Sequence, residues 1–209
     1  MNKKFYKFCI NMIRPIVKIF YPYEVHGTEN LSGISDGYIL CSNHLSNMDP
    51  VFLAVTHNKP IFFMAKVELF RNKLFGFILK KLGVFPIKRG KADINALEHA
   101  MQIPKSKEVL GIFIEGTRSK TGEFLRPRSG ATVLANKSQS GIVPVCITGS
   151  SEDNKIHIFK KTTISYGKPI KLNQIVIEEN NRKDLKEATN FIMENIKKLR
   201  SNCNGNSNN

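Results

Sequence analysis

Apolar positions at the amino terminus repeat with a helical period. From Phe5 to Phe20, apolar side chains recur at spacings of three and four, with lysines and arginines between them. This pattern predicts a basic amphipathic helix or pair of helices over residues 1–22, kinked or restarted at Pro15. The interspersed charges leave no run of about 20 apolar residues, so we do not expect the segment to span a bilayer. It suits either a membrane interface or packing on the protein's own core.

After residue 22, short apolar runs alternate with helical patterns. Strands are expected at residues 37–41, 60–65, 83–87, 109–114, 142–147 and 162–166. Helices are expected from Asp49 onward and at residues 73–82, 94–103, 129–137 and 182–200. Several strands are apolar throughout, which is typical of a sheet covered by helices on both faces. We therefore predict an α/β fold with a mostly parallel central sheet flanked by helices. It forms a single domain over residues 23–200, and a disordered asparagine-rich tail follows at residues 201–209.

Composition narrows the setting of this domain. The chain has 209 residues and is 41% hydrophobic, which is enough for one domain with a sizeable core. Lysine and arginine exceed aspartate and glutamate by 32 to 17, giving a net charge of +15. This excess favours a polyanionic partner such as anionic lipid, a phosphorylated metabolite or nucleic acid. The four cysteines show no CxxC spacing, as is typical of reduced thiols in a cytosolic protein.

The segment from residue 41 to residue 50 carries the first candidate chemistry. His44 follows an expected strand, and Asp49 begins an expected helix that has Pro50 at its first position. A loop between the two can bring them together, and a carboxylate bonded to one imidazole nitrogen leaves the other free to deprotonate a hydroxyl group. Alternatively, Asp49 only caps the helix and His44 is structural. No second histidine or cysteine stands nearby at a ligand spacing, so we expect no metal site.

A second polar cluster follows the expected strand at 109–114. Glu115, Gly116, Thr117 and Arg118 would lie at the edge of the sheet, where α/β proteins bind ligands. Arg118 suits bidentate contact with phosphate, Thr117 can donate to the same oxygens, and Gly116 lets backbone amides come close. Glu115 could hold the arginine or receive a substrate hydroxyl. The alternative is a surface turn with an ion pair.

Further cations end two other expected strands. Lys66 and the pair Lys88-Arg89 could reach the same edge of the sheet, or they could be solvated surface charges. Between them, the expected helix at 73–82 is apolar almost all round. Its apolar surface predicts either a core helix or a wall for an acyl chain.

Four blocks of the chain match the motifs of a known family in order and approximate spacing. The first block is Asn43-His44 with Asp49. The second runs from Lys66-Val67-Glu68-Leu69-Phe70 through Gly83 and Pro86 to Arg89-Gly90. The third is Glu115-Gly116-Thr117-Arg118-Ser119, and the fourth is Ile142-Val143-Pro144-Val145. With these blocks the chain resembles the glycerolipid acyltransferase family, and within it the 1-acyl-sn-glycerol-3-phosphate acyltransferases of the bacterial PlsC type. It departs from the family at Lys73 and Ile114, where proline is common.

The resemblance implies a reaction and a role for each block. His44 would take the proton from the sn-2 hydroxyl of lysophosphatidic acid, and Asp49 would hold the imidazole. The alkoxide would attack a fatty acyl thioester, either acyl-CoA or acyl carrier protein, to give phosphatidic acid without a cofactor. The phosphate-binding groups would be Arg118, Thr117, the Gly116 amide and Arg89, and Lys66 would stabilise the thioester oxyanion.

The resemblance also bears on partners and location. It favours the membrane interface for residues 1–22, and hence a peripheral or monotopic protein on the cytoplasmic face of the cell membrane, in contact with anionic lipid. Another lysophospholipid or glycerol 3-phosphate stays open as the acceptor. A catalytically silent lipid-binding protein is disfavoured because His44 and Asp49 are both present. A nucleic-acid-binding module is supported by charge alone, since the chain has no tryptophan and no RNP or zinc-finger pattern, so we expect no nucleic acid partner.

Overall fold

The structure is a computed structural model that describes residues 1–88, 93–175, 177–178 and 181–205. Its helices are α1 (Lys3–Phe20), α2 (Asp49–Thr56), α3 (Lys73–Lys81), α4 (Ile94–Lys105), α5 (Gly130–Ser138) and α6 (Arg182–Gly205). Its strands are β1 (Tyr23–His26), β2 (Tyr38–Ser42), β3 (Ile61–Lys66), β4 (Val84–Ile87), β5 (Val109–Phe113), β6 (Ile142–Gly149) and β7 (Thr162–Tyr166). Short 3-10 helices lie in the connections at η1 (Thr28–Leu31), η2 (Val67–Phe70) and η3 (Leu172–Gln174).

The strands form one sheet in the order β1-β7-β6-β2-β5-β3-β4. Pairing is parallel from β6 across to β4, whereas β7 is antiparallel to β6 and carries β1 parallel to itself at the edge. At the centre, β2 is buried at every position because neighbouring strands and helices on both faces cover it. The carboxyl ends of β2 and β5 lie side by side, so the loops that follow these strands begin next to each other.

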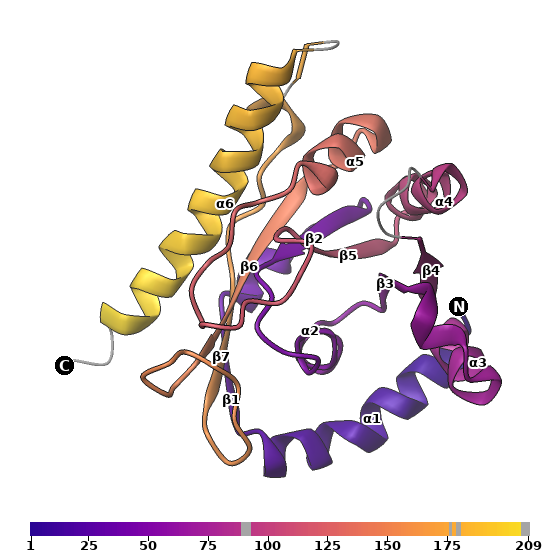
Figure 1. The fold of residues 1–209 in the computed structure, drawn as a ribbon, viewed down its shortest axis with the longest axis vertical. Coiled ribbons are helices and arrows are strands. Elements are labelled where there is room, and N and C mark those ends of the chain that lie inside the picture. The colour runs from indigo at the N-terminus through magenta and orange to yellow at the C-terminus, as the bar shows by residue number, and fades with distance from the viewer. Residues whose placement is uncertain (89–92, 176, 179–180, 206–209) are drawn as a thin grey trace.

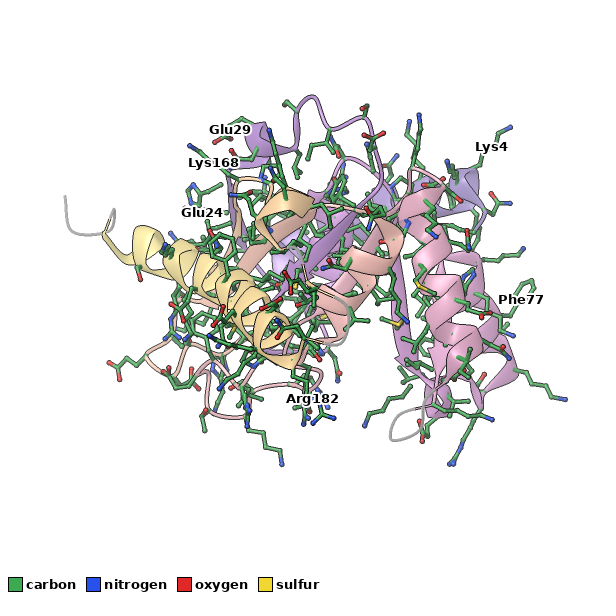
Figure 2. All side chains as sticks on the ribbon, turned by 90° about the horizontal axis from the view of Figure 1, so that it is seen from above. Lys4, Glu24, Glu29, Phe77, Lys168 and Arg182 are labelled. Carbon is green, nitrogen blue, oxygen red and sulfur yellow. The ribbon has the colours of Figure 1, made fainter. Side chains whose placement is uncertain are left out.

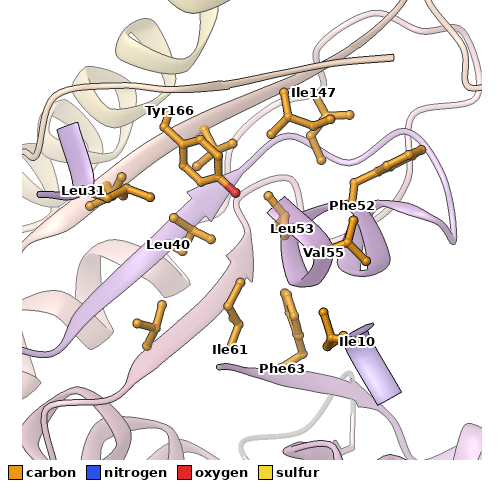
Figure 3. Close-up of a cluster of buried hydrophobic side chains, with 14 of the residues drawn as sticks. Ile10, Leu31, Leu40, Phe52, Leu53, Val55, Ile61, Phe63, Ile147 and Tyr166 are labelled. Carbon is orange, nitrogen blue, oxygen red and sulfur yellow. The ribbon is translucent and has the colours of Figure 1, made fainter. Parts of the chain in front are cut away.

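Helices cover both faces of this sheet (Figure 1). On one face α1 and α2 pack against the strands, and Figure 3 shows this cluster with Ile10 of α1, Phe52 and Leu53 of α2, and Phe63 of β3. On the other face α4, α5 and α6 bury a second cluster that includes Ala135 and Ile192. The predicted α/β fold with a mostly parallel, helix-flanked sheet is therefore confirmed.

Three features differ from the expectations. Strand β1 was not predicted, because Tyr23–His26 alternates half-buried and exposed side chains and so lacks an apolar run. Helix α1 continues through Pro15 without restarting, since both halves pack the same inner face on the core. Helix α6 continues to Gly205, so the tail is helical at residues 201–205 and not disordered, because extending an existing helix costs little. Residues 206–209 lie outside the described ranges.

Helix α1 contributes both to the core and to the surface. Its inner face buries Tyr6, Ile10 and Val17, and Arg14 Nε donates to the Val55 carbonyl at the end of α2 at 3.0 Å. Its outer face leaves a row of large apolar side chains 46–65% exposed, at Phe8, Met12, Ile16, Ile19 and Phe20. Core packing, one of the two alternatives for this helix, is thus confirmed for its inner face, while its outer apolar face is exposed.

Helix α3 does not form part of the core. Only Gly76 is buried in it, and its apolar side chains are 36–72% exposed at Leu74, Phe75, Phe77 and Ile78. Of the two alternatives for this helix, a core helix and a wall for an acyl chain, the core helix is therefore wrong. The amino end of α1 touches the carboxyl end of α3, where Lys81 lies over the rings of Phe5 and Phe77. Figure 2 shows Lys4 and Phe77 on the periphery of the same end of the molecule. Among the described helices, none combines the length and hydrophobicity needed to cross a membrane.

Candidate active site

His44 lies in the loop between β2 and α2, and its ring is bonded to Asp49. His44 Nδ1 is 2.7 Å from Asp49 Oδ2, so the predicted approach of the two side chains is confirmed. The Asp49 side chain is fully buried, and that of His44 is 14% exposed. Because Nδ1 donates to the carboxylate, Nε2 is the nitrogen left to accept a proton, and no described group is bonded to it.

Asp49 organises the histidine loop and does not cap the helix. The N-cap residue of α2 is Met48, which makes no capping bond, while Pro50 occupies the first turn as predicted. Asp49 Oδ2 instead turns back to accept the backbone N–H groups of Leu45 at 2.6 Å and Ser46 at 2.8 Å. The helix-cap alternative is therefore wrong. Three donors fix this oxygen, so the carboxylate holds the backbone and the imidazole in one arrangement.

Asn43 fixes the other side of the loop. Its buried amide group donates to the Ile147 carbonyl at 2.8 Å and accepts the Ile147 N–H at 2.8 Å. These paired bonds continue the pairing of β2 with β6 beyond the last residue of β2. The peptide that leads into His44 is thereby tied to the centre of the sheet.

The imidazole rests on an aromatic stack built by β5 and β3. The rings of His44 and Phe113 are 4.0 Å apart and nearly parallel, and Phe113 stacks in turn on Phe63 at 6.0 Å. Gly111 makes room for this stack, because a Cβ atom there would lie 2.2 Å from Cε1 of Phe63. One face of the imidazole is thus closed by a ring, which leaves its outer edge to meet a substrate.

The turn after β5 is bonded directly to the histidine loop. The Ser119 N–H donates to the His44 carbonyl at 2.8 Å, and Gly116 adopts a φ of 69°, a left-handed conformation that favours glycine. The Gly116 N–H already donates to the Phe113 carbonyl at 3.0 Å. The expectation that the Gly116 amide is free for a phosphate is therefore wrong. Arg118 is exposed and forms no ion pair with any described carboxylate, so the ion-pair alternative is wrong as well.

Glu115 is a buried carboxyl group next to this loop. It is 2% exposed, and its Oε2 has no hydrogen-bond partner in the described part of the chain. Burial raises the pKa of Glu115 to about 7, and the negative charge of Asp49 adds to this rise, against backbone hydrogen bonds from Leu125 and His44 that lower it. Glu115 therefore carries a proton in part of the molecules at neutral pH.

A cavity of about 660 Å³ opens beside this turn. It lies between the segment 125–129, the first half of α6 and the turn itself, which contributes Glu115 and Thr117. Four cationic side chains line it, those of Arg126, Arg128, Arg182 and Lys186. Thr117 lies on this cavity, whereas Arg118 is not among its lining residues.

A sequence model of the Acyltransferase family matches residues 22–148, which include the histidine pair, the turn and most of the sheet. The chain belongs to the acyltransferase family. The 1-acyl-sn-glycerol-3-phosphate acyltransferase of Bacillus subtilis is 31% identical over 79% of this chain and 82% of that protein. The protein of the same name from Streptococcus pneumoniae is 30% identical over 72% of this chain and 56% of that protein.

The fold of the acyltransferase also has a solved counterpart. The crystal structure of the 1-acyl-sn-glycerophosphate acyltransferase PlsC from Thermotoga maritima matches with a TM-score of 0.70 over 92% of this chain and 78% of that chain. At 22% identity, this likeness concerns the fold. It supports the layered arrangement that places the histidine loop at the edge of the sheet.

Of the two remaining expected substrate-binding cations of the acyltransferase, one has no described contact with the histidine loop and the other lies outside the described residues. Lys66 ends β3 as an exposed residue, with no described contact to His44 or Asp49. Strand β3 pairs with β5 only as far as Phe63 and then follows β4. Arg89 lies outside the described residues. Within the described ranges, no three histidine, cysteine or acidic side chains are grouped to hold a metal ion.

Sequence reasoning missed several residues that shape the site of the acyltransferase. The motif that contains Asn43 predicts no role for this residue, although an amide directly before the histidine can indicate a loop anchor. For Phe113 the sequence predicts only a place in an apolar strand, whereas its ring stacks on the imidazole of His44. Arg126 and Arg128 stand two positions apart in the segment after the turn. This spacing was the available signal that both side chains lie on the same side of the segment, where they line the cavity.

Proposed function

We propose that this acyltransferase transfers a fatty acyl group from a thioester donor to the sn-2 hydroxyl of lysophosphatidic acid. The observation that carries the proposal is the bond between His44 Nδ1 and Asp49 Oδ2, which leaves Nε2 unpaired beside a turn that presents an unpaired arginine. The matched relatives from Bacillus subtilis and Streptococcus pneumoniae, named as 1-acyl-sn-glycerol-3-phosphate acyltransferases, support lysophosphatidic acid as the acceptor.

His44 acts as a general base and then as a general acid. Nε2 takes the proton of the acceptor hydroxyl while its oxygen attacks the thioester carbonyl carbon. The carbon–sulfur bond then breaks, and the departing sulfur receives the proton from Nε2. Asp49 keeps the imidazole oriented and stabilises its charged form, because the carboxylate is held by two backbone N–H groups and cannot turn away.

Arg118 supplies the contact with the acceptor phosphate. It is exposed and without a described ion-pair partner, and the residue after it is bonded to the His44 carbonyl. A guanidinium group suits the oxygens of a phosphate. Phosphate bound there would hold the acceptor hydroxyl near Nε2, and such positioning lowers the barrier without a covalent intermediate on the enzyme.

The acceptor and the product are membrane lipids, and the exposed apolar face of α1 with α3 suits contact with a bilayer. This face carries Phe8, Ile16 and Phe77, among other exposed apolar side chains. Lysines flank it, as expected for binding at the headgroup level of anionic lipid. We assign this contact to the cytoplasmic leaflet of the cell membrane, with the protein peripheral or monotopic.

The test is an acyl-transfer assay with lysophosphatidic acid, lysophosphatidylcholine and glycerol 3-phosphate as competing acceptors. Lysophosphatidic acid should have the highest kcat/KM. For Arg118→Ala, we expect the KM for lysophosphatidic acid to rise about 10- to 100-fold, since a charged hydrogen bond contributes roughly 1.5–3 kcal/mol. Lys120→Ala, an exposed cation two residues further along, is the control. A preference for another acceptor, or an unchanged KM in Arg118→Ala, would contradict the proposal.

A further inference from the structure

Two large apolar side chains protrude from the loop that joins β6 to β7. Ile158 is 54% exposed and Phe159 is 66% exposed, and the two are adjacent in the chain. Phe159 also has a φ of 62°, a left-handed conformation that bulky residues rarely adopt. A strained backbone that holds a large ring in solvent is unfavourable unless something covers the ring. Ile158 and Phe159, the loop tip, are therefore candidates for a binding surface.

Hydrogen bonds fix the loop behind its tip. The Ser150 N–H donates to the Lys161 carbonyl at 2.9 Å and closes the base of the loop. The buried side chain of Asn154 accepts the Gly149 N–H at 3.0 Å and donates to the Gly122 carbonyl at 2.7 Å, which ties the loop to the segment after β5. Because β6 runs parallel to β2, the loop begins at the same edge of the sheet as the histidine loop.

The loop tip is joined to the carboxyl end of α1. The Phe159 N–H donates to the Phe20 carbonyl at 2.7 Å, and the centres of the two rings are 5.8 Å apart. Figure 1 shows the orange loop after β6 reaching this end of α1. Phe20 is the last member of the exposed apolar row on the outer face of α1. The row and the loop tip therefore form one continuous apolar surface, built from two distant parts of the chain.

Positive charge surrounds this continuous surface. Helix α1 contains no acidic residue, and its cations are Lys3, Lys4, Lys7, Arg14 and Lys18. The loop after Asp153 adds three lysines and likewise no acidic residue. Lys155 pairs with Asp153 at 3.6 Å. Lys161 pairs with Glu24 at 3.0 Å, whereas Lys160 is exposed and forms no ion pair with a described carboxylate.

The charge favours a lipid surface as the occupant. An apolar surface edged by lysines matches a bilayer interface with anionic headgroups, because the apolar side chains reach the acyl boundary while the lysines stay at the headgroup level. A second copy of the chain carries the same net charge of +15, so two such surfaces would repel each other.

We infer that the loop tip inserts into the interface of an anionic lipid bilayer, beside the outer face of α1. The inference deepens the proposed function and rests on it for the contact of α1 with lipid. A protein that touches a bilayer through one helix alone can turn about the axis of that helix. A second contact from the loop restricts this rotation and brings the sheet edge that carries His44 toward the lipid.

A single indole can report on the loop tip, because the chain has no tryptophan. The full-length Phe159→Trp variant is mixed with vesicles of phosphatidylcholine and phosphatidylglycerol in equal parts. We expect its emission to shift to shorter wavelength and to be quenched by lipids brominated on their acyl chains. Phe191→Trp is the matched control, since Phe191 is 40% exposed on α6, which covers the other face of the sheet. The control should show neither change.

A second variant removes the apolar tip and keeps the charge. Ile158→Ser with Phe159→Asn should retain the melting temperature, because asparagine accepts a φ of 62° more readily than phenylalanine. Its binding to the same vesicles, measured by co-sedimentation, should fall by about tenfold or more, since two apolar side chains no longer leave water. Ile94→Ser with Phe191→Asn makes the same chemical changes on α4 and α6 and should bind as the unmodified chain does.

Neither measurement involves acyl transfer, so both results stand even if the acceptor is not lysophosphatidic acid. An unquenched indole in Phe159→Trp, or unchanged vesicle binding by Ile158→Ser with Phe159→Asn, would overturn the inference and leave the contact of α1 intact. An unmodified chain that did not bind the vesicles would overturn both. Sedimentation equilibrium without lipid should give the same mass for the unmodified chain and the tip variant. A dimer that only the unmodified chain forms would assign the tip to a second copy and refute the inference.

Discussion

At the scale of single residues, Glu115 makes the stability of the protein depend on pH. The pKa of its carboxyl group is raised from 4.5 to about 7, chiefly by burial. Below pH 4.5 this carboxyl group is protonated in both the folded and the unfolded chain, so no charge is buried on folding. Between pH 4.5 and pH 7 the unfolded chain loses this proton more readily, so the stability contributed by Glu115 declines and is lost above pH 7.

We expect Glu115→Gln to stabilise the fold more at pH 8 than at pH 5. The difference should be on the order of 2–3 kcal/mol, because one pKa unit corresponds to about 1.4 kcal/mol. Urea unfolding at the two pH values measures it. Glu123→Gln makes the same chemical change on an exposed side chain of the same loop and serves as the control. An equal effect of Glu115→Gln at both pH values would show that burial does not hold the proton on this group.

At the scale of elements, β5 carries the aromatic stack on which the imidazole of His44 rests. An added methyl group at Gly111 would meet Phe63 at 2.2 Å, and Phe63 cannot move without disturbing Phe113 and then His44. We expect Gly111→Ala to destabilise the protein by about 1–3 kcal/mol and to lower kcat, as overpacking of a core does. Thermal unfolding and acyl-transfer rates measure the two effects.

Gly130→Ala is a matched control for Gly111→Ala, because it makes the same change outside the aromatic stack. Gly130 begins α5 close to the site, and a Cβ atom there would meet nothing within 4 Å. This variant should keep both its melting temperature and its kcat. A Gly111→Ala protein that also kept both would mean that the stack is not tightly packed.

Helix α1 makes a separate prediction about the membrane. Its outer face exposes Phe8 by 61% and Ile16 by 53%, and each apolar side chain buried in a bilayer contributes about 1.5–3 kcal/mol. We expect Phe8→Glu with Ile16→Glu to reduce binding to anionic vesicles at least tenfold, measured by co-sedimentation. The fold should persist, because neither side chain belongs to the core.

The control for this prediction is Leu97→Glu with Phe191→Glu. These side chains are 37% and 40% exposed on α4 and α6, which cover the other face of the sheet. This pair should bind vesicles as the unmodified chain does. If it lost binding while the α1 variant retained it, the membrane contact would lie on that other face.

At the scale of the whole molecule, the sequence predicted the layered arrangement of sheet and helices better than it predicted which apolar faces are exposed. Strands such as Val109–Phe113 are apolar throughout, and this pattern can mean only a covered strand or a buried helix. In contrast, the apolar residues of α3 predicted either a core helix or a wall for an acyl chain, and they lie exposed and not in the core. A periodicity shows that a face is apolar, but it does not show whether protein or lipid covers that face.

The candidate site was predictable where it depended on local chain geometry. A strand, a loop and a proline-initiated helix were enough to bring His44 and Asp49 together. The cavity was not predictable, because Arg128 and Arg182 are distant in sequence and meet only when α6 folds back across the sheet. The prediction that the Gly116 N–H is free for a phosphate was also wrong, because this group donates to the Phe113 carbonyl within the turn.

The central claim is that His44 and Asp49 work as one catalytic unit. The most direct measurement is kcat for lysophosphatidic acid acylation by His44→Ala, Asp49→Asn and the double variant, with melting temperatures recorded for each. We expect each single change to lower kcat by about 10²–10⁴-fold. The double change should be no worse than His44→Ala alone, because the carboxylate acts through the imidazole. A folded His44→Ala protein that kept kcat within tenfold of the unmodified chain would contradict the account.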